Sequence, residues 1–236
     1  MDKQVRMGFD RFLALEWANY SLDLLQSSTS LDEGYSLLKL YLQKEITGEE
    51  SARKTANQLK RLWLHRDSCS PLREKVIAIY QMMTLQDKPV LTYGMAVNVF
   101  PLFHDVCNVI GSQMHLSGGI SRKQIQQRIL EKYGNPVTMP RATDRVVQTL
   151  ENWGFVTTIN GICTVNQMRV DNPMVAHWLV IALLNLQVGK KMPLRDFATL
   201  PTLLGIEVGD IRNIIRQSRD LSLDRTPDAE VIRVVE

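Results

Sequence analysis

Four consecutive segments decide the fold of this chain: SRKQIQQRILEKY (residues 121–133), GNPVTM (134–139), PRATDRVVQTLENW (140–153) and GFVTTINGICTV (154–165). The first and third segments have apolar residues at helical spacing, and the second contains the Gly and Pro that break helices. In the fourth segment, Asn160-Gly161 is a strong signal for a two-residue turn between two strands. We therefore predict the order helix, turn, helix, strand, turn, strand.

The predicted second helix has a polar face opposite its apolar stripe. That face carries four side chains whose donors and acceptors suit base edges in the major groove of DNA: Arg141, Arg145, Gln148 and Asn152. Phosphate contacts are predicted for three cations of the preceding helix and for one hydroxyl of the hairpin: Arg122, Lys123, Arg128 and Thr157. The turn of the hairpin carries no Lys or Arg, which counts against a strong phosphate grip there.

This order of elements, with the junction Leu150-x-x-Trp153-Gly154-Phe155-Val156, resembles the winged-helix superfamily of DNA-binding proteins. The resemblance covers the central segment alone. It implies a helix-turn-helix followed by a β-hairpin, with the second helix placed in the major groove of duplex DNA.

A second resemblance rests on the N-terminal segment SARKTANQLKRLW (residues 51–63). This segment is similar to a helix that contains Ser, then Thr-Ala, then Arg in the BrxA family. The members of that family are small accessory proteins of BREX phage-defence systems. It departs from that family at Asn57, where an Arg is expected, and the last 70 residues or so have no counterpart. The resemblance implies an N-terminal helical region, a helix-turn-helix-like region and DNA binding in a defence setting.

Charge is distributed unevenly along the 236 residues. Residues 1–116 hold thirteen Lys or Arg and thirteen Asp or Glu, residues 117–170 hold seven and three, and residues 171–236 hold eight and nine. The positive excess therefore lies in the segment with the predicted recognition helix, where a phosphate backbone would favour it.

The fold class predicted from the whole chain is mainly α: an N-terminal helical bundle (residues 1–88), a winged-helix domain (89–170) and a second, winged-helix-like domain (171–236). The N-terminal helices are expected over residues 9–25, 31–43, 47–65 and 72–85, the third opened by a capping box at Thr47. A mostly apolar helical stretch, interrupted at Pro101, follows over 91–114. In the third domain, helices are expected over 174–188, 194–204 and 208–219 and strands over 221–223 and 231–235. The apolar helix 174–188 is either a core helix or a dimer interface.

Sequence signals for catalysis are poor, and we predict no enzymatic activity and no cofactor. Ser-x-x-Lys occurs twice without a partner motif, His104 and Cys107 lack a second pair of metal ligands, and no phosphate-binding glycine loop is present. Three widely spaced cysteines and an N-terminus without an apolar segment favour a reducing compartment, and we expect a cytoplasmic protein with no membrane partner.

The function favoured by the sequence is non-catalytic binding of double-stranded DNA, in transcription regulation or antiviral defence. The alternative is a winged-helix adaptor or scaffold that binds another protein, as a homodimer or within a larger complex. Salt response separates them, because phosphate contacts weaken steeply with salt and an apolar protein interface does not.

Overall fold

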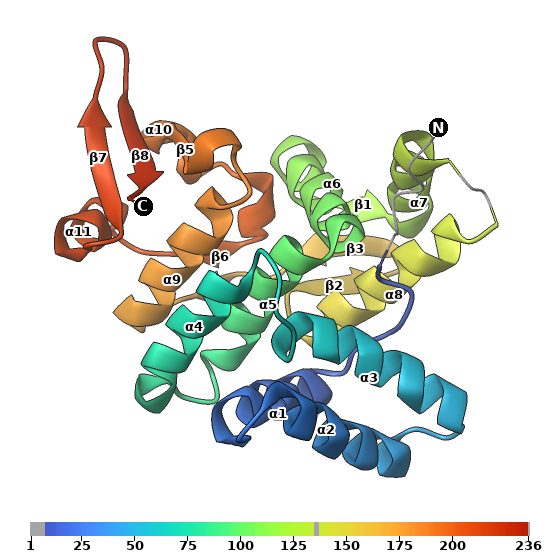
Figure 1. Ribbon diagram of the computed structural model, residues 1–236. Helices are drawn as coiled ribbons and strands as arrows, with labels where there is room; N and C mark the ends of the chain where they lie inside the picture. Colours follow the sequence, from blue (N-terminus) through green and yellow to red (C-terminus); the bar gives the residue numbers. More distant parts are fainter. Residues whose placement is uncertain (1–7, 135–136, 236) are drawn as a thin grey trace, which may run out of the picture.

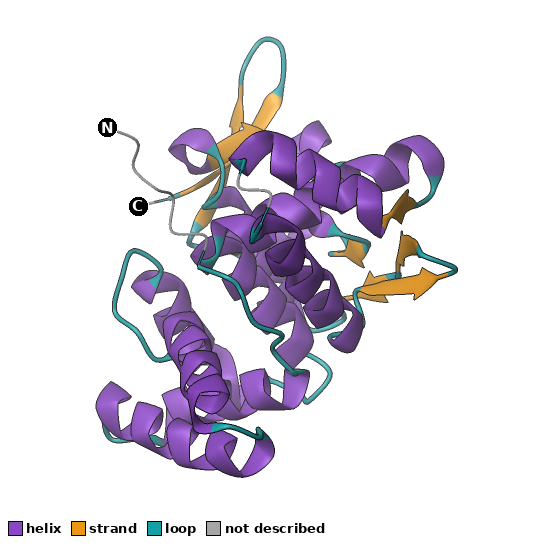
Figure 2. Cartoon of the chain, turned by 90° about the vertical axis from the view of Figure 1, so that its right-hand side faces the viewer, coloured by secondary structure: helices purple, strands orange, loops and turns teal. Residues whose placement is uncertain are grey.

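The computed structural model describes residues 8–134 and 137–235, and it is mainly helical with three small sheets (Figures 1 and 2). The break predicted at residues 134–139 includes residues 135 and 136, which lie outside the described residues. The chain forms an N-terminal bundle, two central helices, and two units that share one topology.

The N-terminal bundle consists of four helices and a 3₁₀ turn: α1 (Leu15–Ser27), α2 (Leu31–Glu45), α3 (Glu49–Trp63), α4 (Ser70–Ile79) and η1 (Tyr80–Met82). Ser30 caps α2 by accepting a hydrogen bond from the Glu33 N–H, as its residue type predicts. The capping box predicted at Thr47 is wrong, because Gly48 is the residue that precedes α3 and no side chain caps that helix.

The prediction of a helix from residue 9 is also wrong. Residues 8–14 are not helical, and Phe9 and Leu13 are nonetheless fully buried. Their apolar spacing reflects burial of an irregular segment against the rest of the molecule. The first helix begins only at Leu15.

Two apolar helices, α5 (Lys88–Val99) and α6 (Pro101–Ser117), run through the middle of the molecule and are bent by 112° relative to each other at Pro101. Pro101 starts the second helix because its missing N–H is not needed in a first turn. α5 packs against α1 and α3 on one side and against α9 (Pro173–Leu184) on the other. These two helices therefore join the bundle to both units.

The first unit consists of α6, β1 (Ile120–Ser121), α7 (Arg122–Tyr133), α8 (Met139–Asn152), β2 (Val156–Ile159) and β3 (Ile162–Val165). Its antiparallel sheet has the order β1-β3-β2, with Ile120 opposite Cys163 and Ile159 opposite Ile162. The helices and the hairpin agree with the prediction. The short strand β1 was not predicted.

The second unit repeats this order with α9, β5 (Lys191–Pro193), α10 (Leu194–Phe197), α11 (Ile211–Gln217), β7 (Leu221–Arg225) and β8 (Glu230–Val234). Its sheet has the corresponding order β5-β8-β7, again antiparallel. The insertion between α10 and α11 holds a 3₁₀ turn (Pro201–Leu203) and β6 (Ile206–Glu207), which pairs in parallel with β4 (Met168–Arg169) after the first hairpin. The β7–β8 hairpin projects from the body in both views (Figures 1 and 2).

A single hydrophobic core runs through the bundle, the central helices and both units. It crosses residues 88/89 and 170/171, where domain boundaries were expected, so the three predicted domains share their packing. Most of α9 is buried, namely Val175, Ala176 and Trp178–Leu184, which makes it a core helix that is exposed only in its first turn, around Met174.

Candidate nucleic-acid interface

α7 and α8 are fixed by local sequence signals at their ends. Ser121 caps α7 in a capping box, in which its hydroxyl accepts from the Gln124 N–H and the Gln124 side chain accepts from the Ser121 N–H. α7 ends at Gly134, whose φ of +65° suits a residue without a Cβ. α8 has Pro140 in its first turn.

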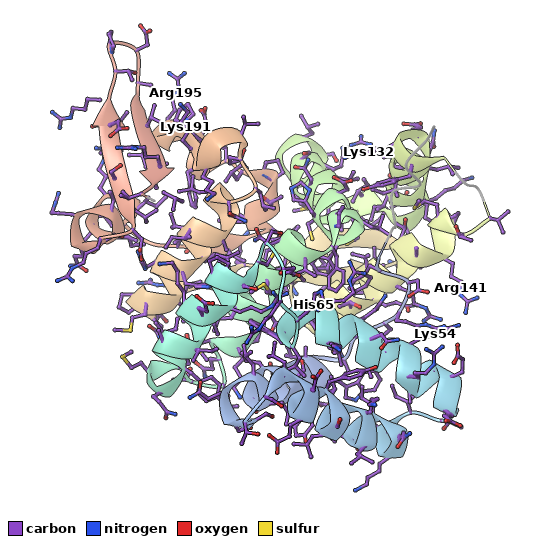
Figure 3. The ribbon with its side chains drawn as sticks, in the orientation of Figure 1. Lys54, His65, Lys132, Arg141, Lys191 and Arg195 are labelled. Carbon is purple, nitrogen blue, oxygen red and sulfur yellow. The ribbon has the colours of Figure 1, made fainter. Side chains whose placement is uncertain are left out.

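The N-terminal half of α8 presents the predicted base-contacting arginines at the surface. Arg141 is exposed and projects away from the body of the molecule (Figure 3). Arg145 is half-buried and its Nη1 donates to Oε1 of Gln148 at 2.7 Å. This half of the helix therefore brings three of the predicted side chains together on one face.

Two acidic residues, Asp144 and Glu151, lie on the same face and were not predicted to take part in it. Asp144 accepts a hydrogen bond from the Gln126 amide at 2.7 Å, and Glu151 accepts from Arg122. Asp144 is three residues from Arg141 and four from Gln148, and Glu151 is three residues from Gln148, so helical spacing places both acids on this face. The face is therefore less positive than its arginines alone indicate.

Asn152 is exposed, but its side chain is engaged in a contact with a distant part of the chain. Its Oδ1 accepts a hydrogen bond from the Leu15 N–H at 2.7 Å, so that it caps the first turn of α1 from a distant part of the chain. The neighbouring Thr149 hydroxyl accepts from the Leu13 N–H at 3.1 Å, and the Trp153 indole donates to the Leu13 carbonyl at 2.9 Å. The C-terminal half of α8 thus holds the N-terminal segment, and Asn152 has a structural role there that was not predicted.

The three predicted phosphate contacts of α7 differ in availability. The Arg122 guanidinium lies 2.6 Å from both carboxylate oxygens of Glu151. This ion pair joins α7 to α8 and neutralises the charge of Arg122, so its assignment as a phosphate contact is corrected. Arg128 is exposed and donates to the Gln113 amide oxygen at 2.6 Å, an uncharged partner that leaves its positive charge in place. Lys123 is exposed.

The hairpin of the first unit is short and carries no charge. Asn160 (φ +51°) and Gly161 (φ +78°) form the predicted turn, in which both positions need the left-handed region. The Thr157 hydroxyl donates to the Asn166 amide oxygen at 2.9 Å, and Ile159 and Ile162 are 65% and 44% exposed. The tip therefore offers two apolar side chains and the exposed Thr157.

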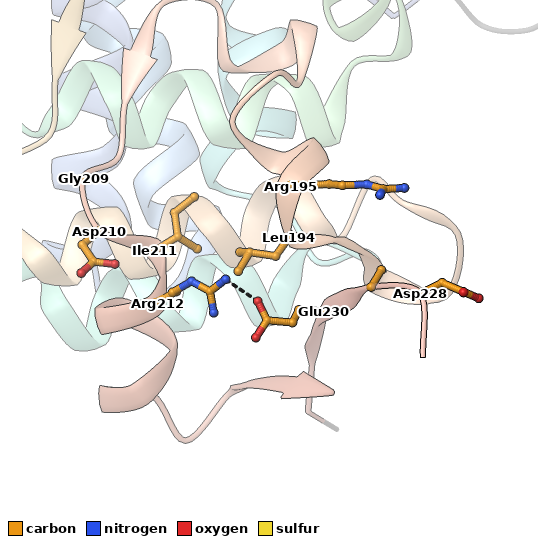
Figure 4. Close-up of a pocket in the computed structure, with 9 residues that line it drawn as sticks. Leu194, Arg195, Gly209, Asp210, Ile211, Arg212, Asp228 and Glu230 are labelled. Atoms are coloured by element: carbon orange, nitrogen blue, oxygen red, sulfur yellow. Dashed lines mark hydrogen bonds and ion pairs between the residues drawn. The ribbon is translucent and has the colours of Figure 1, made fainter. Parts of the chain in front are cut away.

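The corresponding face of the second unit is neutralised by its own acids (Figure 4). Arg212 of α11 forms an ion pair with Glu230 of β8, and Arg225 lies 3.5 Å from the same carboxylate. Arg195 points away from this pair. Arg216 is left as an exposed cation of α11, so this face has little excess charge for a phosphate backbone.

No group of three or more His, Cys, Asp or Glu side chains suited to a metal ion occurs among residues 8–134 and 137–235. His104 contacts Asp105, and Cys69, Cys107 and Cys163 are buried free thiols. Burial raises the pKa of the Cys163 thiol to about 11, which keeps it protonated and unreactive near neutral pH.

Comparison with protein-family models, with curated proteins and with solved structures finds no significant match to this chain. In the described part of the chain no single helix is long and apolar enough to cross a membrane; α5 and α6 reach that length and composition only as a pair bent by 112°.

Proposed function

We propose that this chain binds double-stranded DNA through a winged-helix unit formed by residues 101–165, without catalysing a reaction. The observation that carries the proposal is the exposed Arg141 at the start of α8, with Arg145 and Gln148 one and two turns further along the same face. Arginine at the N-terminal half of such a helix suits the acceptor pair of guanine in the major groove. The regulatory or phage-defence setting implied by the sequence resemblance belongs to the same proposal.

The proposed interface is smaller than the one derived from the sequence. Arg141, Arg145 and Gln148 would contact bases, and Lys123 and Arg128 of α7 would contact phosphates, with Thr157 at the edge. Asn152 and Arg122 are left out of the proposed contacts, because they are engaged by Leu15 and Glu151. Residues 117–170, which include this surface, carry the positive excess of the chain.

The test is the binding of a fluorescent random-sequence duplex, measured by anisotropy at about 50 and 200 mM salt. We expect the affinity of the wild type to fall about tenfold over that range, as the two phosphate contacts of Lys123 and Arg128 would require, and further if the arginines of α8 also neutralise phosphates. Replacing Arg141→Ala and Arg145→Ala together should weaken binding about tenfold or more at the lower salt, because two base or phosphate contacts are lost.

The matched control is Arg216→Ala with Arg219→Ala, which removes the same charge from exposed positions far from α8. Its affinity should stay within about twofold of the wild type, since a general charge effect is small at that distance. Equal weakening in both double variants would mean that net charge alone drives binding. An unchanged Arg141/Arg145 variant would remove α8 from the interface.

A protein-interaction adaptor is the second candidate, and the apolar hairpin tip is the observation that favours it. A wing that grips phosphates commonly carries a cation, whereas this one exposes Ile159 and Ile162. Absence of DNA binding at about 50 mM salt would favour the adaptor, because electrostatic contacts are strongest there.

A further inference from the structure

A surface groove lies where the N-terminal bundle meets the second unit, between α4, α9 and α11. It encloses about 590 Å³, and its apolar lining includes Ile79, Met82, Met174, Trp178 and Ile214. All three walls are helices, and no strand edge borders the groove among its lining residues. A partner that adds a strand to a sheet has nothing to pair with here, whereas an amphipathic helix can pack its apolar face between helices.

Two of the apolar side chains of this groove are open to solvent. Met82 is 50% exposed and Met174 is 40% exposed, whereas Trp178 forms a buried floor. A small-molecule site would enclose its ligand far more completely. Unbranched, flexible methionines are typical of surfaces that adapt to the apolar face of a bound helix.

The charged groups that line the groove leave an excess of positive charge. Lys75 on the α4 wall forms an ion pair with Asp220 at 2.8 Å, and Arg219 beyond the end of α11 is exposed. His177 contacts the Ser218 hydroxyl at 2.7 Å, and burial lowers its pKa, so it stays uncharged near neutral pH. Because Lys75 is paired with Asp220, the excess charge is that of Arg219, and an acidic side chain beside the apolar face of a partner helix would meet it at the rim.

We propose that this groove binds one amphipathic helix of another protein, with an apolar face and acidic flanks. α11 and α8 lie at opposite ends of the molecule (Figure 1), as do the labelled Arg195 and Arg141 (Figure 3). A helix in the groove therefore leaves the proposed DNA-binding face of α8 open. The inference goes beyond DNA binding and stands whether or not the chain binds DNA.

The experiment is selection of helical peptides of about 16 residues from a displayed random library by the full chain. Peptides that also bind the Met82→Glu, Met174→Glu double variant are removed. We expect the remaining peptides to share apolar residues at i, i+3, i+4 and i+7 with Asp or Glu beside them. Affinity for the best peptide should fall at least about tenfold in the double variant, because each glutamate places a charge among apolar groups.

Charge is tested separately with Arg219→Glu. This variant should weaken the acidic peptide about fivefold and should strengthen a copy of the peptide with Lys in place of the acids. The matched control is Leu40→Glu on α2, an equally apolar side chain that is 59% exposed outside the groove. It should bind the peptide as the wild type does, and circular dichroism confirms that each variant is folded.

Three results would overturn the proposal. The library could yield no peptide that depends on the groove methionines, or the enriched peptides could carry basic flanks. Alternatively, the chain alone could form a dimer in size-exclusion chromatography with light scattering, and the Met82/Met174 variant could be a monomer. That last result would assign the groove to a second copy of this chain.

Discussion

Asp105 is the acidic side chain that fastens α6 to α7. Its carboxylate accepts hydrogen bonds from Lys132 at 2.7 Å and from the Tyr133 hydroxyl, contacts His104 at 3.3 Å, and is 7% exposed. Burial alone would raise the pKa of Asp105, and these three donors outweigh it, so that the pKa lies at about 2, below its ordinary 3.8. The charged form of Asp105 therefore stabilises the packing of α7, the helix that supports α8.

This shift predicts how the stability of an Asp105→Asn variant depends on pH. A depressed pKa in the folded state contributes stability above the unfolded value and loses it as pH falls towards the folded value. We expect the variant to lose about 2 kcal/mol of unfolding free energy at pH 7 and roughly a third of that near pH 2.5. Urea unfolding of both proteins at the two pH values measures the difference. Asp171→Asn, at an exposed ion pair with Arg169, should change stability little at either pH, and a constant difference for Asp105→Asn would show that its charge is not responsible.

At the scale of elements, α8 has two halves with different roles. Its first half carries the proposed DNA contacts, and its second half holds residues 13–15 through Thr149, Asn152 and Trp153.

Replacing Thr149→Val keeps the shape of the side chain but leaves the buried Leu13 N–H without its acceptor, which should cost about 1–3 kcal/mol of unfolding free energy. Affinity for DNA should stay within about twofold, because Arg141 and Arg145 are untouched. Thr164→Val, which removes a hydroxyl donating to the Thr157 carbonyl at an exposed site, should cost about 0.5 kcal/mol or less. An equal cost for the two variants, or a large loss of DNA affinity in Thr149→Val, would contradict the division of α8.

The elements that sequence predicts well are those defined by local signals. The Asn160-Gly161 turn and the apolar stripe of α8 each depend on a few neighbouring residues, and each lies where predicted. The strands β1 and β5 were missed because two or three residues have no periodicity, and they exist only through pairing with β3 and β8. The same reason explains Asn152, whose partner Leu15 is 137 residues away in sequence and is invisible to a local pattern.

At the scale of the whole molecule, the bundle and the two units share one core, and α5 is where they meet. Gly94 of α5 faces α9 so closely that an added Cβ would lie 2.6 Å from Cζ3 of Trp178. Trp178 in turn donates its indole N–H to the Leu72 carbonyl of α4 at 2.9 Å. Packing at Gly94 therefore couples the bundle to the second unit.

This coupling predicts that Gly94→Val destabilises the entire chain in one step. The added side chain overpacks the contact between α5 and α9 and should cost about 1–3 kcal/mol or more. Because α3, α8 and α9 lie in the same core, the hydrogen-exchange protection of their amides should fall by the same free energy. Tryptophan fluorescence and far-UV circular dichroism should report one unfolding midpoint.

The control is Gln43→Val, a β-branched substitution on the exposed side of α2, which should cost no more than about 0.7 kcal/mol. Two separate midpoints, with protection lost in α9 and kept in α3 and α8, would instead show that the units fold independently, and the boundary near residue 88 would then divide the chain after all.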